Sequence, residues 1–496
     1  MVLGSVLIIF FTGRLITFMK SFSTENYVSI QELESIVGAA GICRWQDTEP
    51  FWQERVEKAV APDTKMDCTV YPNTQEELAA VIAWAQQHRC AVLPCGSGSK
   101  LDWGGLVKLD SDPPRPRAGT GAPPLQRGEQ DVVKVGLFKG DLRVSPDAAG
   151  LVAVSTSRLN RLVEHAVGDL TVTAEAGMKF ADLQQILAAA GQFLPIDPAY
   201  PQQATLGGIV ATADAGSLRH RYRGVRDLLL GITFVRSDGK IAVAGGRVVK
   251  NVAGYDLMKL FTGAYGTLGV ISQVTFRVYP LPESSGTVVL TGEINALSQT
   301  AQILLSSALT PSAVDLLSPE LVAKLGLGKG TGLIVRFQSI APSVKQQSAR
   351  LLEVGEKLGL QGTSYGENDE NQLWQRLPET MWDSGTKSAI ICKIGIRPSE
   401  AVTAINTLPI QNAWIHAGSG LGVLRFENAT ADTLLQVRRG CEAKGGFLTV
   451  LAAPTDIKQQ LDVWGYTGSA IDLMRRIKQQ FDPENILSPH RFISGI

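Results

Sequence analysis

Residues 91–99, AVLPCGSGS, run from an apolar, strand-like segment into a loop built from small residues. Such side chains leave successive backbone N–H groups bare, and a run of this kind can form a concave nest for an anion. The loop has two interpretations, a phosphate-binding site or a plain tight turn. Leu101 stands where a G-x-G-x-x-G motif has its third Gly, and no Lys-Ser/Thr pair completes a P-loop. The loop is therefore neither a Rossmann fingerprint nor a Walker motif.

Two further segments are rich in small residues. The first runs from IDP at 196–198 through ATLGGIVAT at 204–212 to Asp227, and the second includes GYDL at 254–257 and GAYGTLGVI at 263–271. A backbone without bulky side chains can lie flat against a planar ligand. Each segment alone could be a set of turns between strands. The order and spacing of all of them along the chain are a far more specific signal than any one segment.

Together these segments resemble the FAD domain of the vanillyl-alcohol oxidase/PCMH flavoprotein family. The closing run FDPENILSP at 481–489 is similar to that family's C-terminal tail, which returns to the flavin domain. Within the family, GSLR at 216–219, GVRD at 224–227 and VKNVAGYDL at 249–257 look most like the FAD-binding subunits of glycolate oxidases. The resemblance covers about residues 65–282 and the last stretch of the chain.

The resemblance implies an α+β fold with a PCMH-type, two-subdomain FAD-binding domain, an α+β cap domain and a returning tail. The alternation of β-rich runs with helices agrees with such an architecture. We expect an N-terminal segment with helices at 1–62, the FAD domain at 63–282 with a mobile Pro- and Gly-rich insertion at about 107–150, the cap at 283–450, and a C-terminal helix and tail at 451–496. In the cap we expect a separate sheet with helices on one face. Thr74 followed by Glu77 predicts a capped helix over 74–88.

The family pattern also implies which residues hold FAD. The loop 94–99 would cradle the diphosphate, residues 205–212 would line the isoalloxazine and ribityl region, and residues 269–271 would touch the adenine side. The expected cofactor-binding residues are Pro94, Cys95, Gly96, Ser97, Gly98, Ser99, Pro198, Thr205, Gly207, Gly208, Ala211, Thr212, Gly216, Gly269, Val270 and Ile271. Members with covalent flavin often carry a His in the first glycine loop, which this chain lacks, so we expect non-covalent FAD.

Oxidation of a 2-hydroxy acid needs a base for the hydroxyl proton, a cation for the carboxylate and flavin as hydride acceptor. His416 and His220 are the candidate bases, and Arg397 and Arg425 are the candidate cations, with nothing in the sequence to rank one arginine above the other. Structural interpretations stand beside these. His416 lies in an apolar stretch and could be a core histidine, and His220 lies in a basic run that could be a solvated loop.

One motif departs from the family. Catalytic 2-hydroxyacid dehydrogenases of the family carry H-A-G-D-G-N-x-H in the cap, in which histidines bind metal or substrate, whereas residues 416–423 read HAGSGLGV. Ser419 replaces the acid and Val423 the second histidine. One imidazole without a carboxylate binds a hard metal ion weakly, so we expect no metal. Catalysis by a complex would then rest mainly on its other flavoprotein.

Composition limits the partners. Lys+Arg and Asp+Glu both total 47, so the basic excess of a dedicated nucleic-acid binder is missing. The six cysteines include no C-x-x-C pair, which leaves no usual ligand set for zinc or iron–sulfur clusters and favours a reducing compartment. We expect a cytoplasmic protein; the apolar run at 2–13 is interrupted by Arg14, and peripheral membrane contact through a complex is the alternative.

The function implied by the resemblance is that of the FAD-binding subunit of a glycolate oxidase/dehydrogenase complex. Such a subunit oxidises glycolate or D-lactate to the 2-oxo acid beside a second flavoprotein and an iron–sulfur subunit. One alternative is a self-sufficient FAD-linked D-2-hydroxyacid dehydrogenase. The other is an assembly subunit that holds flavin without a catalytic site of its own.

Overall fold

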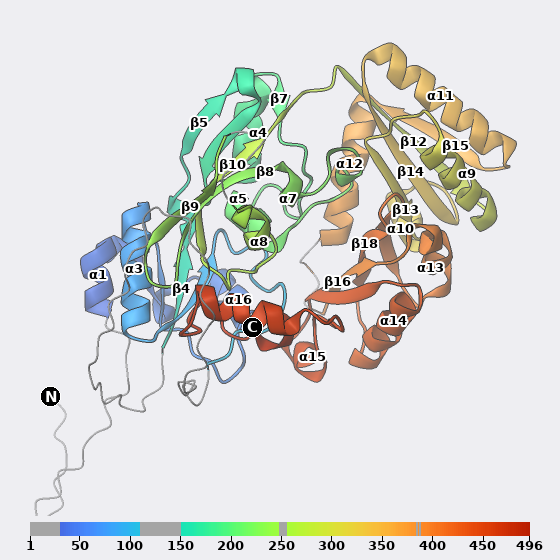
Figure 1. Ribbon diagram of the computed structural model, residues 1–496. Helices are drawn as coiled ribbons and strands as arrows, with labels where there is room; N and C mark the ends of the chain where they lie inside the picture. Colours follow the sequence, from blue (N-terminus) through green and yellow to red (C-terminus); the bar gives the residue numbers. More distant parts are fainter. Residues whose placement is uncertain (1–29, 110–149, 248–254, 383–384, 386–387) are drawn as a thin grey trace, which may run out of the picture.

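The computed structural model describes residues 30–109, 150–247, 255–382, 385 and 388–496. In this part of the chain, two sheets from the first half lie beside a large sheet from the second half (Figure 1). The apolar run at 2–13 and most of the insertion expected at 107–150 lie outside the described residues. Within the described ranges, no helix is both long and apolar enough to span a bilayer.

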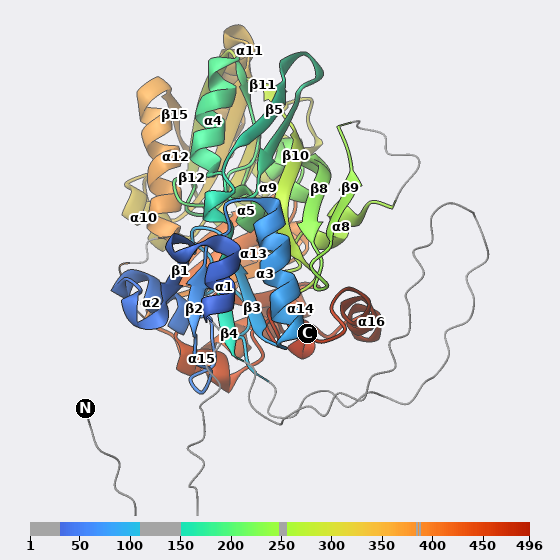
Figure 2. The same cartoon turned by 90° about the vertical axis from the view of Figure 1, so that its left-hand side faces the viewer.

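The first sheet has the strand order β1-β2-β4-β3, with β2 and β3 both parallel to β4 and β1 antiparallel to β2. Helices α1 and α3 pack together against this subdomain, as Figure 2 shows. The predicted cap of α3 is confirmed, because the Thr74 hydroxyl accepts a hydrogen bond from the backbone N–H of Glu77 at 3.1 Å. The elements are α1 (Ile30–Val37), β1 (Ile42–Arg44), α2 (Pro50–Glu57), β2 (Cys68–Val70), α3 (Gln75–Gln87), β3 (Ala91–Cys95) and β4 (Leu151–Ser155).

The second sheet is antiparallel throughout, in the order β5-β6-β10-β8-β9. The short helix α5 packs against β10 and presents its small residues toward the first sheet, which places two glycine-rich segments opposite each other. β7 (Gln192–Phe193) and β11 (Tyr279–Pro280) pair with each other as a small separate sheet. The other elements of this region are β5 (Leu162–Ala166), β6 (Thr171–Glu175), α4 (Phe180–Ala189), α5 (Leu206–Thr212), α6 (Arg219–Tyr222), α7 (Val225–Leu228), β8 (Leu229–Val235), β9 (Ile241–Gly245), α8 (Leu257–Phe261) and β10 (Val270–Arg277). These two sheets form the FAD domain expected from the resemblance.

The cap contains eight antiparallel strands in the order β15-β12-β14-β13-β17-β18-β16-β19. The last strand of the cap sheet, β19, extends past residue 450, where we expected the cap to end. The limits of the domains stay a prediction. The elements are β12 (Ser284–Gly292), α9 (Ile294–Ser306), β13 (Ala313–Leu317), α10 (Pro319–Leu325), β14 (Thr331–Ser339), α11 (Ala341–Lys357), β15 (Gln361–Gly366), α12 (Glu367–Trp382), β16 (Ile390–Gly395), α13 (Ala401–Thr407), β17 (Asn412–His416), β18 (Leu421–Phe426), α14 (Ala431–Ala443) and β19 (Phe447–Ala452).

The expectation of helices on one face of the cap sheet is wrong. Helices α9, α11, α13 and α14 cover one face, whereas α10 and α12 cover the other. The reason lies in the strands, whose successive side chains point to opposite faces. Val288 and Leu290 join one core and Val289 joins the other, so both faces are apolar and both need cover.

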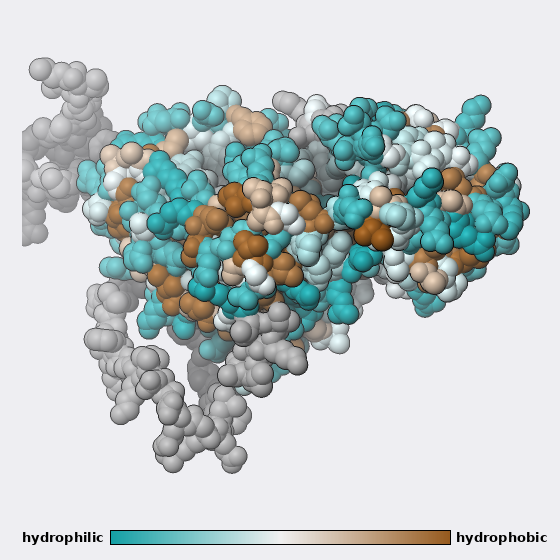
Figure 3. All heavy atoms as spheres, turned by 90° about the horizontal axis from the view of Figure 1, so that it is seen from above, coloured by the Kyte–Doolittle hydropathy of each residue, from teal (hydrophilic) through white to brown (hydrophobic). Residues whose placement is uncertain are grey.

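The C-terminal tail returns to the FAD domain, as the resemblance implied. After α15 (Thr455–Gln460) and α16 (Ile471–Phe481), the chain runs beside β3, where Val92 exchanges backbone hydrogen bonds with Ile486 and Ser488 at 2.7 and 2.8 Å. The buried Lys478 ammonium fastens the turn between α16 and this strand-like segment, because it contacts Asp482 at 2.6 Å and the carbonyl of Leu487 at 2.8 Å. Seen from above, hydrophilic side chains cover most of the molecule, with apolar ones in smaller patches (Figure 3).

Candidate active site

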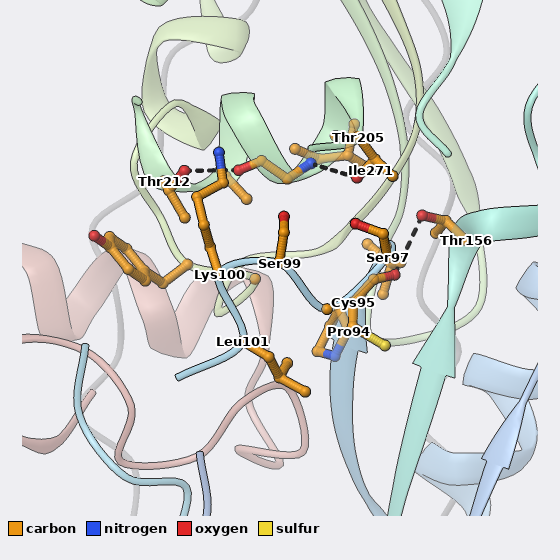
Figure 4. Close-up of a pocket in the computed structure, with 18 of the residues that line it drawn as sticks. Pro94, Cys95, Ser97, Ser99, Lys100, Leu101, Thr156, Thr205, Thr212 and Ile271 are labelled. Carbon is orange, nitrogen blue, oxygen red and sulfur yellow. Dashed lines mark hydrogen bonds between the residues drawn. The ribbon is translucent and has the colours of Figure 1, made fainter. Parts of the chain in front are cut away.

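A pocket opens between the loop after β3 and helix α5, which face each other across it (Figure 4). Nearly all the expected cofactor-binding residues line it. They are Pro94, Cys95, Gly96, Ser97, Gly98, Ser99, Thr205, Gly207, Gly208, Ala211, Thr212, Gly269, Val270 and Ile271. Of the remaining two, Gly216 lines a neighbouring pocket, and Pro198 lies between Asp197 and Ala199 without lining either one.

Glycine is required at this pocket because the chains approach closely. A Cβ on Gly96 would lie 2.1 Å from the Oγ1 of Thr205, and one on Gly207 would lie 2.8 Å from the Cβ of Ala176. Gly98 has φ +75° and faces the ring of Trp52, so a side chain there would be both strained and obstructed. The small residues are therefore needed to shape the pocket walls, which a plain surface turn would not require.

A second pocket adjoins the first at the junction of the FAD domain and the cap. Thr212 and Tyr265 line both pockets. The FAD domain contributes Trp103, Asp197, Asp214, Ala215, Gly216 and Arg219, and the cap contributes Trp382, Lys393, Trp414, His416, Leu421, Gly422, Val423 and Leu451. Charged and aromatic side chains thus gather where the cofactor pocket meets the cap.

His416 is held by a buried carboxylate. Its Nδ1 lies 2.7 Å from Oδ1 of Asp315, and the two residues are register partners on β17 and β13. The other oxygen, Oδ2, accepts hydrogen bonds from Nε1 of Trp414 at 2.9 Å and from the hydroxyl of Ser217. Because Nδ1 is engaged, Nε2 is the nitrogen that remains for chemistry in the pocket.

Two cations in this pocket have no ion pair within the described ranges of the chain. Lys393 comes from β16 and Arg219 from the start of α6. Burial lowers the pKa of Lys393, and the nearby Arg219 charge lowers it further. The pKa of Arg219 is also lowered by burial. Lys393 and Arg219 are half-buried cations without direct ion pairs in the part of the chain that the structure describes, and their mutual repulsion favours an anion between them.

Two carboxylates near the pocket differ in their surroundings. Burial raises the pKa of Asp197 to about 6, against the opposing influence of His416 and of backbone N–H donors such as that of Leu218. Asp214 is instead paired with the buried Lys100, at 2.7 Å. Asp214 therefore forms its ion pair with Lys100, and its charge acts on Lys393 without forming an ion pair.

His220 lies behind His416 and lines a more open cavity with Arg219, Arg223 and Asp227. Burial lowers the pKa of His220. The backbone of Gly418 passes so close that a Cβ there would lie 2.6 Å from Nδ1 of His220. The two histidines predicted as bases are therefore neighbours, and only His416 also lines the pocket next to the cofactor site.

The two arginines predicted as carboxylate ligands lie elsewhere. Arg425 is buried on β18, with Nε and Nη2 bound to the Glu427 carboxylate at 3.0 and 3.1 Å. Arg397 is exposed after β16, where its backbone N–H donates to the carbonyl of Lys444. Neither lines the two adjoining pockets. Among the described residues, no group of three or more His, Cys, Asp or Glu side chains is arranged to hold a metal ion.

Comparison with known proteins assigns the chain to a family. A family model for an FAD binding domain matches residues 135–245. Glycolate oxidase subunit GlcE of Escherichia coli is 32% identical over 339 residues, which cover 68% of this chain and 85% of that protein. The chain belongs to the family of glycolate oxidase subunit GlcE. It is a FAD-dependent oxidoreductase.

More distant relatives of this GlcE family member agree over most of its length. Glycolate oxidase subunit GlcD of Bacillus subtilis is 23% identical over 86% of this chain and 89% of its own length, and the mitochondrial D-lactate dehydrogenase [cytochrome] of Arabidopsis thaliana is 22% identical over 86% and 73%. Among solved structures, 4-ethylphenol oxidase from Gulosibacter chungangensis has a TM-score of 0.66 at 14% identity, covering 93% of this chain and 96% of that one. p-Cresol methylhydroxylase has a TM-score of 0.63 at 13% identity, covering 93% and 95%. These two structures confirm the PCMH-type fold.

The pocket also contains residues that the sequence analysis of this GlcE family member did not predict to bind the cofactor. Lys100, Leu101, Thr156, Tyr265, Gly266 and Arg491 also line the FAD pocket. Tyr265 and Gly266 belong to a quoted motif, so their string was a usable signal, and Lys100 directly follows the first loop. Arg491, Asp315 and Lys393 lie in segments that look like an ordinary tail and ordinary strands, and only the fold brings them to the site.

Proposed function

We propose that this chain is the FAD-binding subunit of a glycolate oxidase-like complex that oxidises glycolate or D-lactate to the 2-oxo acid. The second pocket, with an acid–base pair and two unpaired cations beside the FAD pocket, carries the proposal. When bound, FAD supplies the acceptor for the hydride that leaves the hydroxyl-bearing carbon. The chain's own residues orient the substrate and take its proton.

Lys393 and Arg219 are the proposed ligands of the substrate carboxylate. Both line the pocket, neither has an ion pair in the described part of the chain, and both are disfavoured as charged groups by burial. A bound carboxylate relieves the repulsion between them, and Arg219 can engage it through its planar guanidinium. They replace Arg397 and Arg425 as the leading candidates because those two lie outside the pocket.

His416 is the proposed base. Asp315 accepts from Nδ1, which fixes the ring and leaves Nε2 unprotonated to receive the hydroxyl proton. The buried carboxylate then stabilises the imidazolium that forms. This arrangement needs no metal, in agreement with the change of the family motif to Ser419 and Val423.

FAD is proposed to be held non-covalently. Burial raises the pKa of the Cys95 thiol in the first loop to about 12, so that side chain stays a thiol and is a poor nucleophile. No histidine lines the FAD pocket among the described residues. The glycines shape the walls of the pocket, and Lys100, which lines it, is already paired with Asp214.

A complex with a second flavoprotein and an iron–sulfur subunit is part of the proposal. Relatives named as glycolate oxidase subunits support an assembly of several chains. The six cysteines contain no cluster-binding spacing, so electrons leaving the flavin need an acceptor on another chain. A self-sufficient dehydrogenase and a flavin-holding assembly subunit are the competing functions.

The test is anaerobic addition of glycolate and D-lactate to the purified, FAD-loaded chain. Bleaching of the visible flavin band that is lost in Lys393→Met, but kept in the exposed control Lys357→Met, supports a substrate site in this chain. A band that stays unbleached alone and also in the reconstituted complex carrying an inactivated partner flavoprotein would assign oxidation to that partner. Folded protein without any flavin would refute the cofactor role for the isolated chain.

A further inference from the structure

A buried positive charge from the C-terminal tail borders the FAD pocket. Arg491 is 4% exposed and lines the pocket together with the first glycine loop. Its Nη2 donates to the carbonyls of Leu101 at 2.7 Å and Trp103 at 3.2 Å, whereas its Nε is buried without a hydrogen-bond partner. No carboxylate forms an ion pair with it within the described ranges.

The lack of a direct ion pair sets Arg491 apart from two comparable groups. Lys100, on the same pocket, is paired with Asp214 at 2.7 Å, and Lys478, in the same tail, is paired with Asp482 at 2.6 Å. A buried charge is costly unless it is paired and hydrogen-bonded. Arg491 has no such direct partner in the described part of the chain, and the Asp102 charge acts on it without forming an ion pair, so its surroundings favour an anionic or electron-rich ligand.

Other unpartnered polar atoms gather at the same place. Among the described residues, Nε1 of Trp103 and the hydroxyl of Ser488 are also buried without partners. Trp103 accepts from Arg491 through its carbonyl, and the Ser488 hydroxyl lies 3.4 Å from the position of a Cβ on Gly266, which lines the FAD pocket. A buried polar atom that is left without a hydrogen-bond partner is costly. The Arg491 and Ser488 atoms therefore show that the tail brings unpartnered polar groups to the wall of the FAD pocket.

The position of Arg491 indicates which part of FAD it faces. Arg491 acts electrostatically on Tyr265, and Tyr265 lines both the FAD pocket and the adjoining pocket with His416. The reacting ring of FAD has to reach that junction, because the hydride crosses it. A positive charge beside the ring stabilises the reduced, more electron-rich state relative to the oxidised one.

We infer that Arg491 is the positive charge that faces the flavin ring of FAD and raises its reduction potential. The inference concerns the cofactor and does not depend on which hydroxy acid is oxidised. The competing account is purely structural, in which Arg491 straps the tail to the carbonyls of Leu101 and Trp103. A third account assigns the charge to the FAD diphosphate.

The experiment compares Arg491→Gln with Arg491→Lys in the FAD-loaded full chain, with Lys478→Gln as the control for a buried cation of the same tail. The reduction potential is measured by equilibration with a reference dye, the affinity of oxidised FAD by its fluorescence on release, and stability by thermal unfolding of the apoprotein. We expect Arg491→Gln to lower the equilibrium constant for reduction at least tenfold, about 30 mV for a two-electron couple. Arg491→Lys should stay within threefold, and Lys478→Gln should lose stability without a change in potential.

Two results would overturn the inference. An unchanged potential in Arg491→Gln, with lower thermal stability, would leave only the structural strap. An unchanged potential with a tenfold weaker binding of oxidised FAD would assign the charge to the diphosphate. Should Arg491→Gln not fold, Arg491→Lys decides alone, since a tenfold fall with the charge retained contradicts the electrostatic account.

Discussion

The substitution Asp315→Asn tests the proposed base through its hydrogen-bond geometry. Oδ2 of Asp315 accepts from the indole N–H of Trp414, which can only donate, so the amide oxygen of Asn has to take the Oδ2 position. The NH₂ group then occupies the Oδ1 position, 2.7 Å from Nδ1 of His416. That nitrogen is forced to accept, the ring proton moves to Nε2, and the base is lost.

The expected effect is a fall of about 10²–10⁴ in the rate of flavin reduction by substrate, the range that general-base catalysis contributes. The assay is anaerobic stopped-flow at saturating substrate, with the FAD content of each variant determined beforehand. Asp227→Asn is the matched control, because Asp227 lines the cavity behind His416 and bonds only to the backbone of Gly224 among the contacts described. A rate for Asp315→Asn within threefold of the unmodified chain, with FAD bound, would refute the role of His416.

Three further predictions concern stability and cofactor binding. The pKa of Asp197 in the folded chain is about 6, above its ordinary value of 3.8, so the folded state binds the extra proton and stability falls as pH rises between about 4 and 6. The loss of unfolding free energy is at most about 3 kcal/mol. The denaturant midpoints at pH 4 and pH 8 should therefore differ less in Asp197→Asn than in the unmodified chain. The same difference in both proteins would contradict this. Lys478→Met should cost about 3–5 kcal/mol in unfolding free energy because it leaves the buried Asp482 carboxylate without its cation. The exposed Arg475→Gln should stay within about 0.5 kcal/mol, and similar values for both would count against the pairing. Gly207→Ala should weaken FAD binding tenfold or more by fluorescence titration, whereas Gly168→Ala, which meets open space, should not; equal affinities would show that the pocket wall can shift freely.

The pocket proposed for FAD was predictable because its signals are local. Glycines such as Gly96 and Gly207 are required by close backbone approach, and that requirement appears in the sequence as a run of small residues. The capping of α3 by Thr74 is local in the same way. Such features depend on neighbours within a few residues, so one chain segment contains the whole signal.

The cap side of the site was not predictable in this way. Asp315 and His416 are adjacent only because β13 and β17 pair in register, across 101 positions of sequence. The carboxylate ligands were sought among arginines at strand ends, but the orientation of β16 places Lys393 in the pocket and carries Arg397 past it. Which face of a strand looks inward depends on sheet order, and a single sequence with strands buried on both faces does not reveal it.

The Asp315 carboxylate joins two tasks in one group. Its Oδ1 orients His416 within the cap, and its Oδ2 accepts from Ser217, which belongs to the FAD domain. The Asp315 carboxylate therefore also links the two domains. A change in the position of the cap relative to the FAD domain would alter the hydrogen bond that orients the His416 ring. A partner subunit that tilts the cap by even a small angle would weaken the hydrogen bond between Asp315 and Ser217. It would thereby change the proton affinity of His416 without contacting either pocket.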